Sequence, residues 1–458
     1  QKYMETKEQY KDCILFYRLG DFYEMFFDDA LVASKELEIT LTGKSCGLEE
    51  RAPMCGIPYH AVEGYLSKLV SRGYKVAICE QVEDPKLAKG LVKREVIRVV
   101  TPGTNLNVQS LEAGKNNYLL SIAYTPDGIG ISAADVTTGD YYVTEVEDLK
   151  KLNDELMKYE PSEIICNEAF LVSGFDVNDL KSRLHISVNA LESHMFDDDG
   201  CRRILMKHFK VNTLIGLGVE EFPTGLLAAG ALLQYLYDTQ KTDLEHFTHI
   251  YPYLTSKYML LDSSTRRNLE LTETLREKQK RGSLLWVLDK TKTAMGARLL
   301  RNYIEQPLIE KDEMEKRLDA IQELNQDSIS RDEIREYLNP IYDLERLLSK
   351  VTYKTANPRD LIAFRNSLQM LPPIKTVLSA FEKEELTEIR EQIDGLEDIY
   401  QLIDEAIIEE PPISIREGGM IKDGFDETID RLRSAKHDGK QWLAQLEEED
   451  RERTGIKN

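Results

Sequence analysis

The hydrophobic pattern of this chain changes near residue 225, and that change restricts the folds open to it. Before this point, segments with the two-residue period of strands alternate with segments that have the three-to-four-residue period of helices. After it, the pattern predicts helices throughout, starting with a strongly apolar helix over residues 226–237. A chain of 458 residues also exceeds what one hydrophobic core usually serves. We therefore expect a multidomain protein, with α/β domains first and an all-α region after them.

Residues 1–112 predict a compact α+β domain. The sequence Thr101-Pro102-Gly103-Thr104 near its end predicts a turn. The patterns before this turn indicate two helices and two strands, over residues 28–37, 63–72, 74–79 and 96–100.

Residues 113–240 predict an α/β domain that begins with a strand meander. Turn sequences rich in Gly, Asp and Thr separate its first three strands, and a helix and a further strand follow. These elements are expected over residues 117–124, 129–136, 141–144, 147–158 and 163–166.

Residues 241–458 predict an all-α domain. A helix is expected over residues 283–303, where Leu284, Leu288 and Leu299 belong to an apolar stripe typical of a core-facing surface. A highly charged segment over residues 425–453 predicts one long helix of about 40 Å, which would suit a rigid arm.

The net charge of −22 argues against a protein that coats nucleic acid through bulk electrostatics. The excess of acid is uneven, because residues 1–104 hold 15 Lys and Arg against 16 Asp and Glu. Any DNA contact is therefore expected to be local. A basic run in this part is open to two interpretations, a solvated surface or a set of phosphate contacts: Lys86, Lys89, Lys93, Arg94 and Arg98.

None of the six cysteines lies in a C-x-x-C pair, so the sequence predicts no metal site. Reduced thiols in a cytoplasmic protein are the expectation that follows. No apolar run approaches the roughly 20 residues of a membrane span, and no signal peptide is visible. Because the chain begins at Gln1 and ends at Asn458 just after a charged segment, we expect it to be a fragment of a longer protein.

The run from Gly20 to Phe26 places an aromatic ring and an acid two residues apart, just after a glycine. In an extended backbone, residues two apart point the same way, so Phe22 and Glu24 would share one face while Tyr23 points to the other. A ring that stacks, beside a carboxyl group that hydrogen-bonds, is suited to probing a nucleic-acid base. Local composition alone favours core packing for such an aromatic run.

Several long stretches, in the same order along essentially the whole chain, resemble the MutS family of bacterial DNA mismatch-repair proteins. Collinear matches of this length are far more specific than a short motif. The stretches include residues 16–30, Gly56-Ile57-Pro58-Tyr59-His60, Val99-Val100-Thr101-Pro102-Gly103-Thr104, Leu261-Asp262-Ser263-Ser264-Thr265-Arg266-Arg267 and Ile415-Arg416-Glu417-Gly418-Gly419.

The resemblance implies three domains and a binding mode. Residues 1–112 would be the mismatch-recognition domain, 113–240 a ribonuclease-H-like connector without nuclease activity, and 241–458 a helical core and lever domain. In this family the Phe of a Phe-x-Glu motif wedges into DNA from the minor groove and stacks on a mispaired or unpaired base. These positions are Phe22 and Glu24 here. Phosphates and desolvation both favour a protonated carboxyl group, so a DNA-bound Glu24 would donate a hydrogen bond to the base.

Full-length members of the family are ATPases that use ATP and Mg, form homodimers and recruit MutL. The resemblance implies that the ATPase domain and the DNA clamp lie outside these 458 residues. For this chain we therefore expect mismatched double-stranded DNA as the partner, no enzymatic activity and no cofactor. The DNA backbone contacts expected here are Lys44, Arg94 and Arg98.

Two other motifs offer competing interpretations. Thr42-Gly43-Lys44-Ser45 is similar to the end of a phosphate-binding loop, but Glu38 stands where that loop needs glycine, so Lys44 is expected to contact a DNA phosphate from a loop. Asp135 and Asp140 would suit the start of a two-metal nuclease site, although positions in a turn explain them better. A nuclease and a helical protein-binding scaffold are the two alternatives to mismatch recognition.

Overall fold

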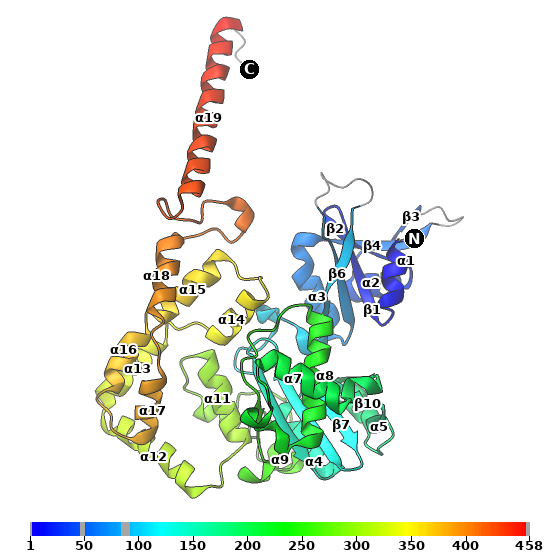
Figure 1. Ribbon diagram of the computed structural model, residues 1–458, viewed down its shortest axis with the longest axis vertical. Coiled ribbons are helices and arrows are strands. Elements are labelled where there is room, and N and C mark those ends of the chain that lie inside the picture. The colour runs from blue at the N-terminus through cyan, green and yellow to red at the C-terminus, as the bar shows by residue number, and fades with distance from the viewer. Residues whose placement is uncertain (1, 46–50, 84–91, 455–458) are drawn as a thin grey trace. The chain divides into compact units, whose positions relative to one another are not determined.

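The computed structural model describes residues 2–45, 51–83 and 92–454 of the chain. They divide into two units, one of residues 1–319 with 343–355 and one of residues 320–342 with 356–458. Two separate six-stranded sheets belong to the first unit (Figure 1). No described helix is long and apolar enough to cross a membrane.

The N-terminal sheet has the strand order β3-β4-β2-β1-β5-β6, in which β1 and β5 run parallel and the other described neighbours run antiparallel. Helices α2 and α3 supply Ala33, Leu66 and Leu69 to the core on one face of this sheet. The predicted helices and strands are confirmed within about three residues at each end. The elements are α1 (Lys2–Gln9), β1 (Cys13–Leu19), β2 (Phe22–Phe26), α2 (Phe27–Leu37), β3 (Thr42–Lys44), β4 (Ala52–Pro58), α3 (Val62–Ser71), β5 (Lys75–Gln81) and β6 (Arg94–Val100).

The second sheet has the strand order β11-β10-β7-β8-β9-β12. Strands β7, β8 and β9 form the predicted antiparallel meander, and β10 and β11 continue it in parallel beside β7. Helices α4, α5 and α6 cover one face and α7 and α8 the other, which confirms the expected α/β domain. The elements are β7 (Leu119–Thr125), β8 (Gly128–Asp135), β9 (Asp140–Val146), α4 (Leu149–Tyr159), β10 (Glu163–Asn167), α5 (Glu168–Leu171), α6 (Val177–Ser182), β11 (Ser187–Leu191), α7 (Asp198–Phe209), α8 (Pro223–Gln240) and β12 (Tyr251–Pro252).

Helix α8 corrects the predicted onset of the helical region. It packs against β8 so closely that a Cβ at Gly130 would lie 1.9 Å from the carbonyl oxygen of Thr224. It therefore belongs to the second sheet, and the segment after it returns to that sheet as β12. The helical region starts at Ser263 instead. A helix that is apolar on all sides is buried on several of them. This pattern does not distinguish a helix that packs on a sheet from a helix in a helical bundle.

The predicted helix over residues 283–303 is wrong in two respects. It is two helices, α10 (Leu284–Leu288) and α11 (Ala294–Glu305), because Asp289 accepts hydrogen bonds from Thr291 and Thr293 caps α11 through Gly296 N–H. The apolar stripe is also not a core: Leu284, Leu288 and Leu299 are 43%, 49% and 51% exposed. The first unit also contains α9 (Ser263–Asn268), α14 (Leu344–Thr352) and the start of α12 (Lys311–Gln326).

The linker between the two sheets is held by buried arginines of the helical region. Arg298 of α11, 3% exposed, donates to the carbonyl oxygen of Ala113 at 2.9 Å. Arg346 of α14, 2% exposed, donates to the carbonyl oxygens of Glu112 and Lys115 at 3.2 and 2.9 Å. Segments far apart in the sequence thereby bind the backbone carbonyl groups of this connection.

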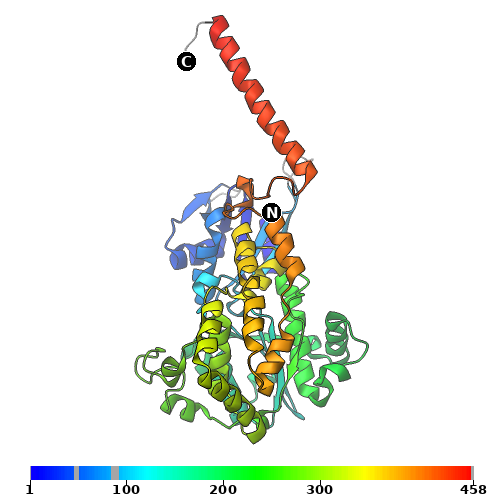
Figure 2. The same ribbon diagram turned by 90° about the vertical axis from the view of Figure 1, so that its left-hand side faces the viewer.

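The second unit is helical. Helix α15 packs against α18 and α13 against α16, with Ile362 and Ile403 in a shared apolar cluster (Figure 2, yellow to orange). The long helix predicted over residues 425–453 is confirmed as α19, and its described apolar residues Leu432 and Leu443 are exposed. The elements are α13 (Ser328–Leu338), α15 (Pro358–Leu368), α16 (Leu371–Leu378), α17 (Glu384–Gln392), α18 (Glu397–Ala406) and α19 (Glu427–Thr454).

Candidate nucleic-acid interface

Strand β2 presents Phe22 and Glu24 on the same face of the N-terminal sheet. Tyr23 and Met25, the alternate residues, are 5% and 0% exposed and belong to the core on the other face. Phe22 is 47% exposed, so its ring is not part of that core. Gly56 of β4 pairs with Glu24, and a Cβ at this position would be in ordinary van der Waals contact with Glu24 Cγ and Phe22 Cδ1, at 3.7 and 3.8 Å.

Lys44 joins this pair from a neighbouring strand. The sequence placed it on a loop, but it lies on β3, which pairs with β4 on the side away from β2. Its ammonium group reaches over β4 to the Glu24 carboxylate, with Nζ 2.6 Å from Oε2. The Lys44 side chain is 43% exposed and that of Glu24 16% exposed. A ring, an acid and a base therefore converge on one face of a rigid sheet.

The structure does not bring Arg94 and Arg98 to this cluster, because both lie on β6 at the opposite edge of the sheet. Arg94 Nε donates to the carbonyl oxygen of Arg18 at 2.7 Å. Arg98 Nε donates to Gln240 Oε1 at 3.0 Å, and its Nη2 donates to the carbonyl oxygen of Thr104 at 2.6 Å. Burial lowers the pKa of the Arg98 guanidinium. These contacts favour a structural role for Arg98, between β6, α8 and the linker.

The remaining members of the basic run give little support to phosphate binding. Lys86 and Lys89 lie outside the described residues. Lys93 pairs with Glu95, with 2.6 Å between Nζ and Oε1. Phosphate contacts by Arg94 and by this run stay predictions.

The two aspartates of the alternative nuclease site hold the turn between β8 and β9 together. The buried Asp135 accepts from the amide and hydroxyl of Thr137 at 2.8 and 2.7 Å, and from Asn116 Nδ2 and Asn117 N at 2.9 and 3.0 Å. Asn116 Nδ2 also donates to Asp140 at 2.8 Å. Among the described residues, no three His, Cys, Asp or Glu side chains are grouped to hold a metal ion. Four donors already occupy Asp135, which favours the turn interpretation.

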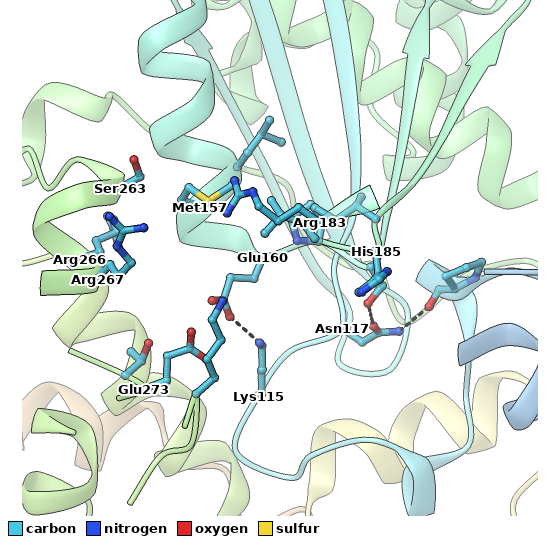
Figure 3. Close-up of a pocket in the computed structure, with 18 of the residues that line it drawn as sticks. Lys115, Asn117, Met157, Glu160, Arg183, His185, Ser263, Arg266, Arg267 and Glu273 are labelled. Atoms are coloured by element: carbon cyan, nitrogen blue, oxygen red, sulfur yellow. Dashed lines mark hydrogen bonds and ion pairs between the residues drawn. The ribbon is translucent and has the colours of Figure 1, made fainter. Parts of the chain in front are cut away.

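A cavity of about 760 Å³ lies where the linker, the end of α4 and the segment around α9 meet (Figure 3). Lys115 of the linker pairs with Glu160 on one side of it, and Arg266 and Arg267 lie on the other (Figure 3). Both arginines belong to α9, whose cap is Asp262, which accepts a hydrogen bond from Thr265 N–H at 2.7 Å. Glu305 of α11 also lines the cavity and is buried.

Glu305 predicts a pH dependence of stability. Burial raises the pKa of its carboxyl group to about 7. The folded state then binds this proton more tightly than the unfolded state does. The free energy of unfolding therefore falls as pH rises from about 4.5 to about 7. We expect Glu305→Gln to flatten the dependence in that window, with urea unfolding at about pH 5 and about pH 8 as the measurement. An unchanged slope would assign the dependence to other groups.

Comparison with known proteins identifies all three regions. Residues 1–109 match the family model of MutS domain I, residues 117–248 that of MutS domain II and residues 264–455 that of MutS domain III. These ranges follow the order and the fold types described above.

Whole-chain relatives agree with these matches. The DNA mismatch repair protein MutS of Lachnoclostridium phytofermentans is 66% identical over 458 residues, covering all of this chain and 49% of the relative. Those of Ruminiclostridium cellulolyticum and Acetivibrio thermocellus are 53% and 51% identical and are covered to 52% and 53% of their lengths. The chain thus spans about half the length of the curated relatives it matches. It belongs to the MutS family of DNA mismatch-repair proteins and contains their domains I, II and III.

Proposed function

We propose that this chain recognises mispaired or unpaired bases in double-stranded DNA, with Phe22 as a wedge inserted from the minor groove and Glu24 as the contact to the base. The observation that carries the proposal is the half-exposed ring of Phe22 beside the Glu24 and Lys44 pair, on the sheet of a MutS domain I. The relatives are named as DNA mismatch repair proteins, which supports DNA as the ligand.

Selectivity in this mechanism comes from the deformability of the DNA. Wedging a ring between base steps costs a few kcal/mol for each unstacked step. A mispair has already lost part of its pairing and stacking, so the same wedge costs less there. Phe22 suits this task because its ring is exposed while the neighbouring Tyr23 and Met25 fix the strand in the core.

Lys44 has two roles in the proposal. In the free protein its ammonium group neutralises Glu24, 2.6 Å away. Near DNA, a phosphate competes with Glu24 for the ammonium group of Lys44. Once Lys44 has left Glu24, the carboxyl group faces a polyanion, which favours its protonated form. Glu24 then donates to an acceptor on the base.

The test compares a duplex that contains one G·T mispair with the matched duplex. Binding is measured by fluorescence anisotropy at one fixed salt concentration, because phosphate contacts make affinity depend on salt. We expect a preference of about 30-fold for the mispaired duplex, the ratio that corresponds to about 2 kcal/mol of stacking on the exposed ring. The measurement is made with this chain and with a longer chain in which the second half of a relative follows residue 458. Equal binding of both duplexes by both chains would contradict the proposal.

Substitutions at Glu24 separate its proposed hydrogen bond from its charge. Glu24→Gln keeps a donor at the base and removes the charge that opposes DNA, so we expect equal or tighter binding of the mispaired duplex. Glu24→Ala removes the donor and should lower the preference for the mispair about fivefold, the value of about 1 kcal/mol for one hydrogen bond. The same anisotropy assay measures both variants, and an equal loss in both would count against the protonated form.

The remaining functions of the whole protein belong to the same proposal. ATP hydrolysis with Mg, homodimerisation and recruitment of MutL are assigned to the longer protein, with the ATPase domain and the clamp outside this chain. We place the domain boundaries at residues 112 and 240, and the protein in the cytoplasm. For the chain itself we propose DNA recognition without catalysis and without a cofactor.

A further inference from the structure

The exposed ring of Phe22 needs an anchor that its own packing does not supply. Phe22 is the first residue of β2, pairs with Leu19 across a two-residue turn and is 47% exposed. The turn consists of Gly20 and Asp21, and Gly20 has a φ of +59°, in the left-handed region that suits glycine. Any looseness of this turn would move the ring directly.

The side chain of Arg18 binds the backbone of this turn. Its Nε donates to the carbonyl oxygen of Gly20 at 2.6 Å, and its guanidinium carbon lies 3.7 Å from the centroid of the Tyr59 ring. The backbone of Tyr59 in turn donates its N–H to the carbonyl oxygen of Asp21 at 3.0 Å. Both carbonyl groups of the turn are therefore bound by protein donors, and the Arg18 side chain itself is 12% exposed.

Two further contacts fix Arg18 itself. Its Nη1 lies 3.6 Å from Glu80 Oε1 of β5, and Arg94 Nε donates to its backbone carbonyl oxygen at 2.7 Å. Glu80 also accepts from the phenol of Tyr23, the residue next to the wedge. Burial, followed by the bond to Glu80, raises the pKa of this phenol, so Tyr23 keeps its proton and the network stays intact at neutral pH.

We infer that Arg18 is a positioning residue that fixes the turn so that the ring of Phe22 is oriented before DNA arrives. Ordering the wedge in advance lowers the conformational entropy lost on binding. Because this loss applies only where the ring inserts, Arg18 acts on the preference for mispaired DNA and not on general affinity. The inference rests on the proposed function, and its anchoring step is measurable without DNA.

The first test is hydrogen exchange of the free chain. Arg18→Met keeps the length of the side chain but removes the donors and the stack on Tyr59, so we expect exchange of the segment 19–23 to accelerate about tenfold. Arg18→Lys keeps the charge without the planar group and should be intermediate. The matched control is Arg72→Met in the same domain, since Arg72 also binds a carbonyl oxygen and a carboxylate, both of Glu36, and should leave this segment unchanged. Unaltered exchange in Arg18→Met would overturn the inference.

The second test is a double-mutant cycle with Phe22→Ala, using the G·T and matched duplexes and the longer chain. We expect Arg18→Met to lower the preference for the mispair about tenfold, and to change nothing further once Phe22 is alanine. An equal loss of affinity for both duplexes, or a loss that persists without the ring, would identify a general DNA contact and overturn the inference. If Phe22→Ala itself keeps the preference, the proposed wedge fails, while the hydrogen-exchange result still decides the anchoring.

Discussion

Phe22→Ala is expected to abolish the preference for mispaired DNA while leaving the fold intact. Stacking of one base on an aromatic ring contributes about 2 kcal/mol, so affinity for a G·T duplex should fall about 30-fold and approach that for the matched duplex. The ring is 47% exposed and lies outside the core, so the free energy of unfolding should change by no more than about 1 kcal/mol. Anisotropy and urea unfolding measure the two effects separately.

The matched control is Tyr251→Ala, which removes a 50% exposed aromatic side chain from β12 of the second sheet. It should alter neither the preference for the mispair nor the affinity for the matched duplex. A fall of several kcal/mol in the stability of Phe22→Ala would instead support the core interpretation that composition favoured. Loss of binding to both duplexes would indicate a general DNA contact in place of a wedge.

Periodicity predicted only part of each sheet, namely strands β5 and β6 of the first and β7 to β10 of the second. Strands β7 to β9 alternate turn residues with apolar runs, and their bounds differ from the prediction by only a few residues. The same reasoning failed over residues 283–303, where the apolar stripe continues through Asp289 and Thr293. Hydrogen bonds of these two side chains end one helix and begin the next, and this local effect is not visible in a pattern of apolar spacing.

The candidate site was predictable only in part, for a similar reason. The two-residue period places Phe22 and Glu24 on one face, and β2 has that geometry. The approach of Lys44 depends on the strand order β3-β4-β2, which sequence spacing does not reveal. The contacts of Arg18 were missed as well, although Gly20-Asp21 between two apolar runs is a hairpin signal that places Arg18 beside the turn.

Arg298→Met is expected to cause the largest loss of stability, because it leaves Asp343 and Glu345 without the buried cation that binds both. Arg298 binds both carboxylate oxygens of Asp343 at 2.7 Å and Glu345 at 2.6 Å, as well as the carbonyl oxygen of Ala113 in the linker. Removing one partner of a buried ion pair costs about 3 to 5 kcal/mol. Since the Glu345 side chain is 41% exposed and water screens part of its charge, we expect about 3 kcal/mol.

Urea unfolding measures this loss, and hydrogen exchange over residues 111–117 locates it, because the linker carbonyl group loses its donor. The matched control is Arg202→Met, where a more exposed arginine binds Asp198 and Glu220 and should cost about 1 kcal/mol or less. Adding Asp343→Asn to Arg298→Met should restore part of the stability, since asparagine still caps α14 and carries no charge, whereas Asp343 would keep only the longer contact of 3.8 Å to Arg346 Nε. If the double variant is no more stable than the single one, the loss arises from packing and from the linker contact, and not from the charge left at Asp343.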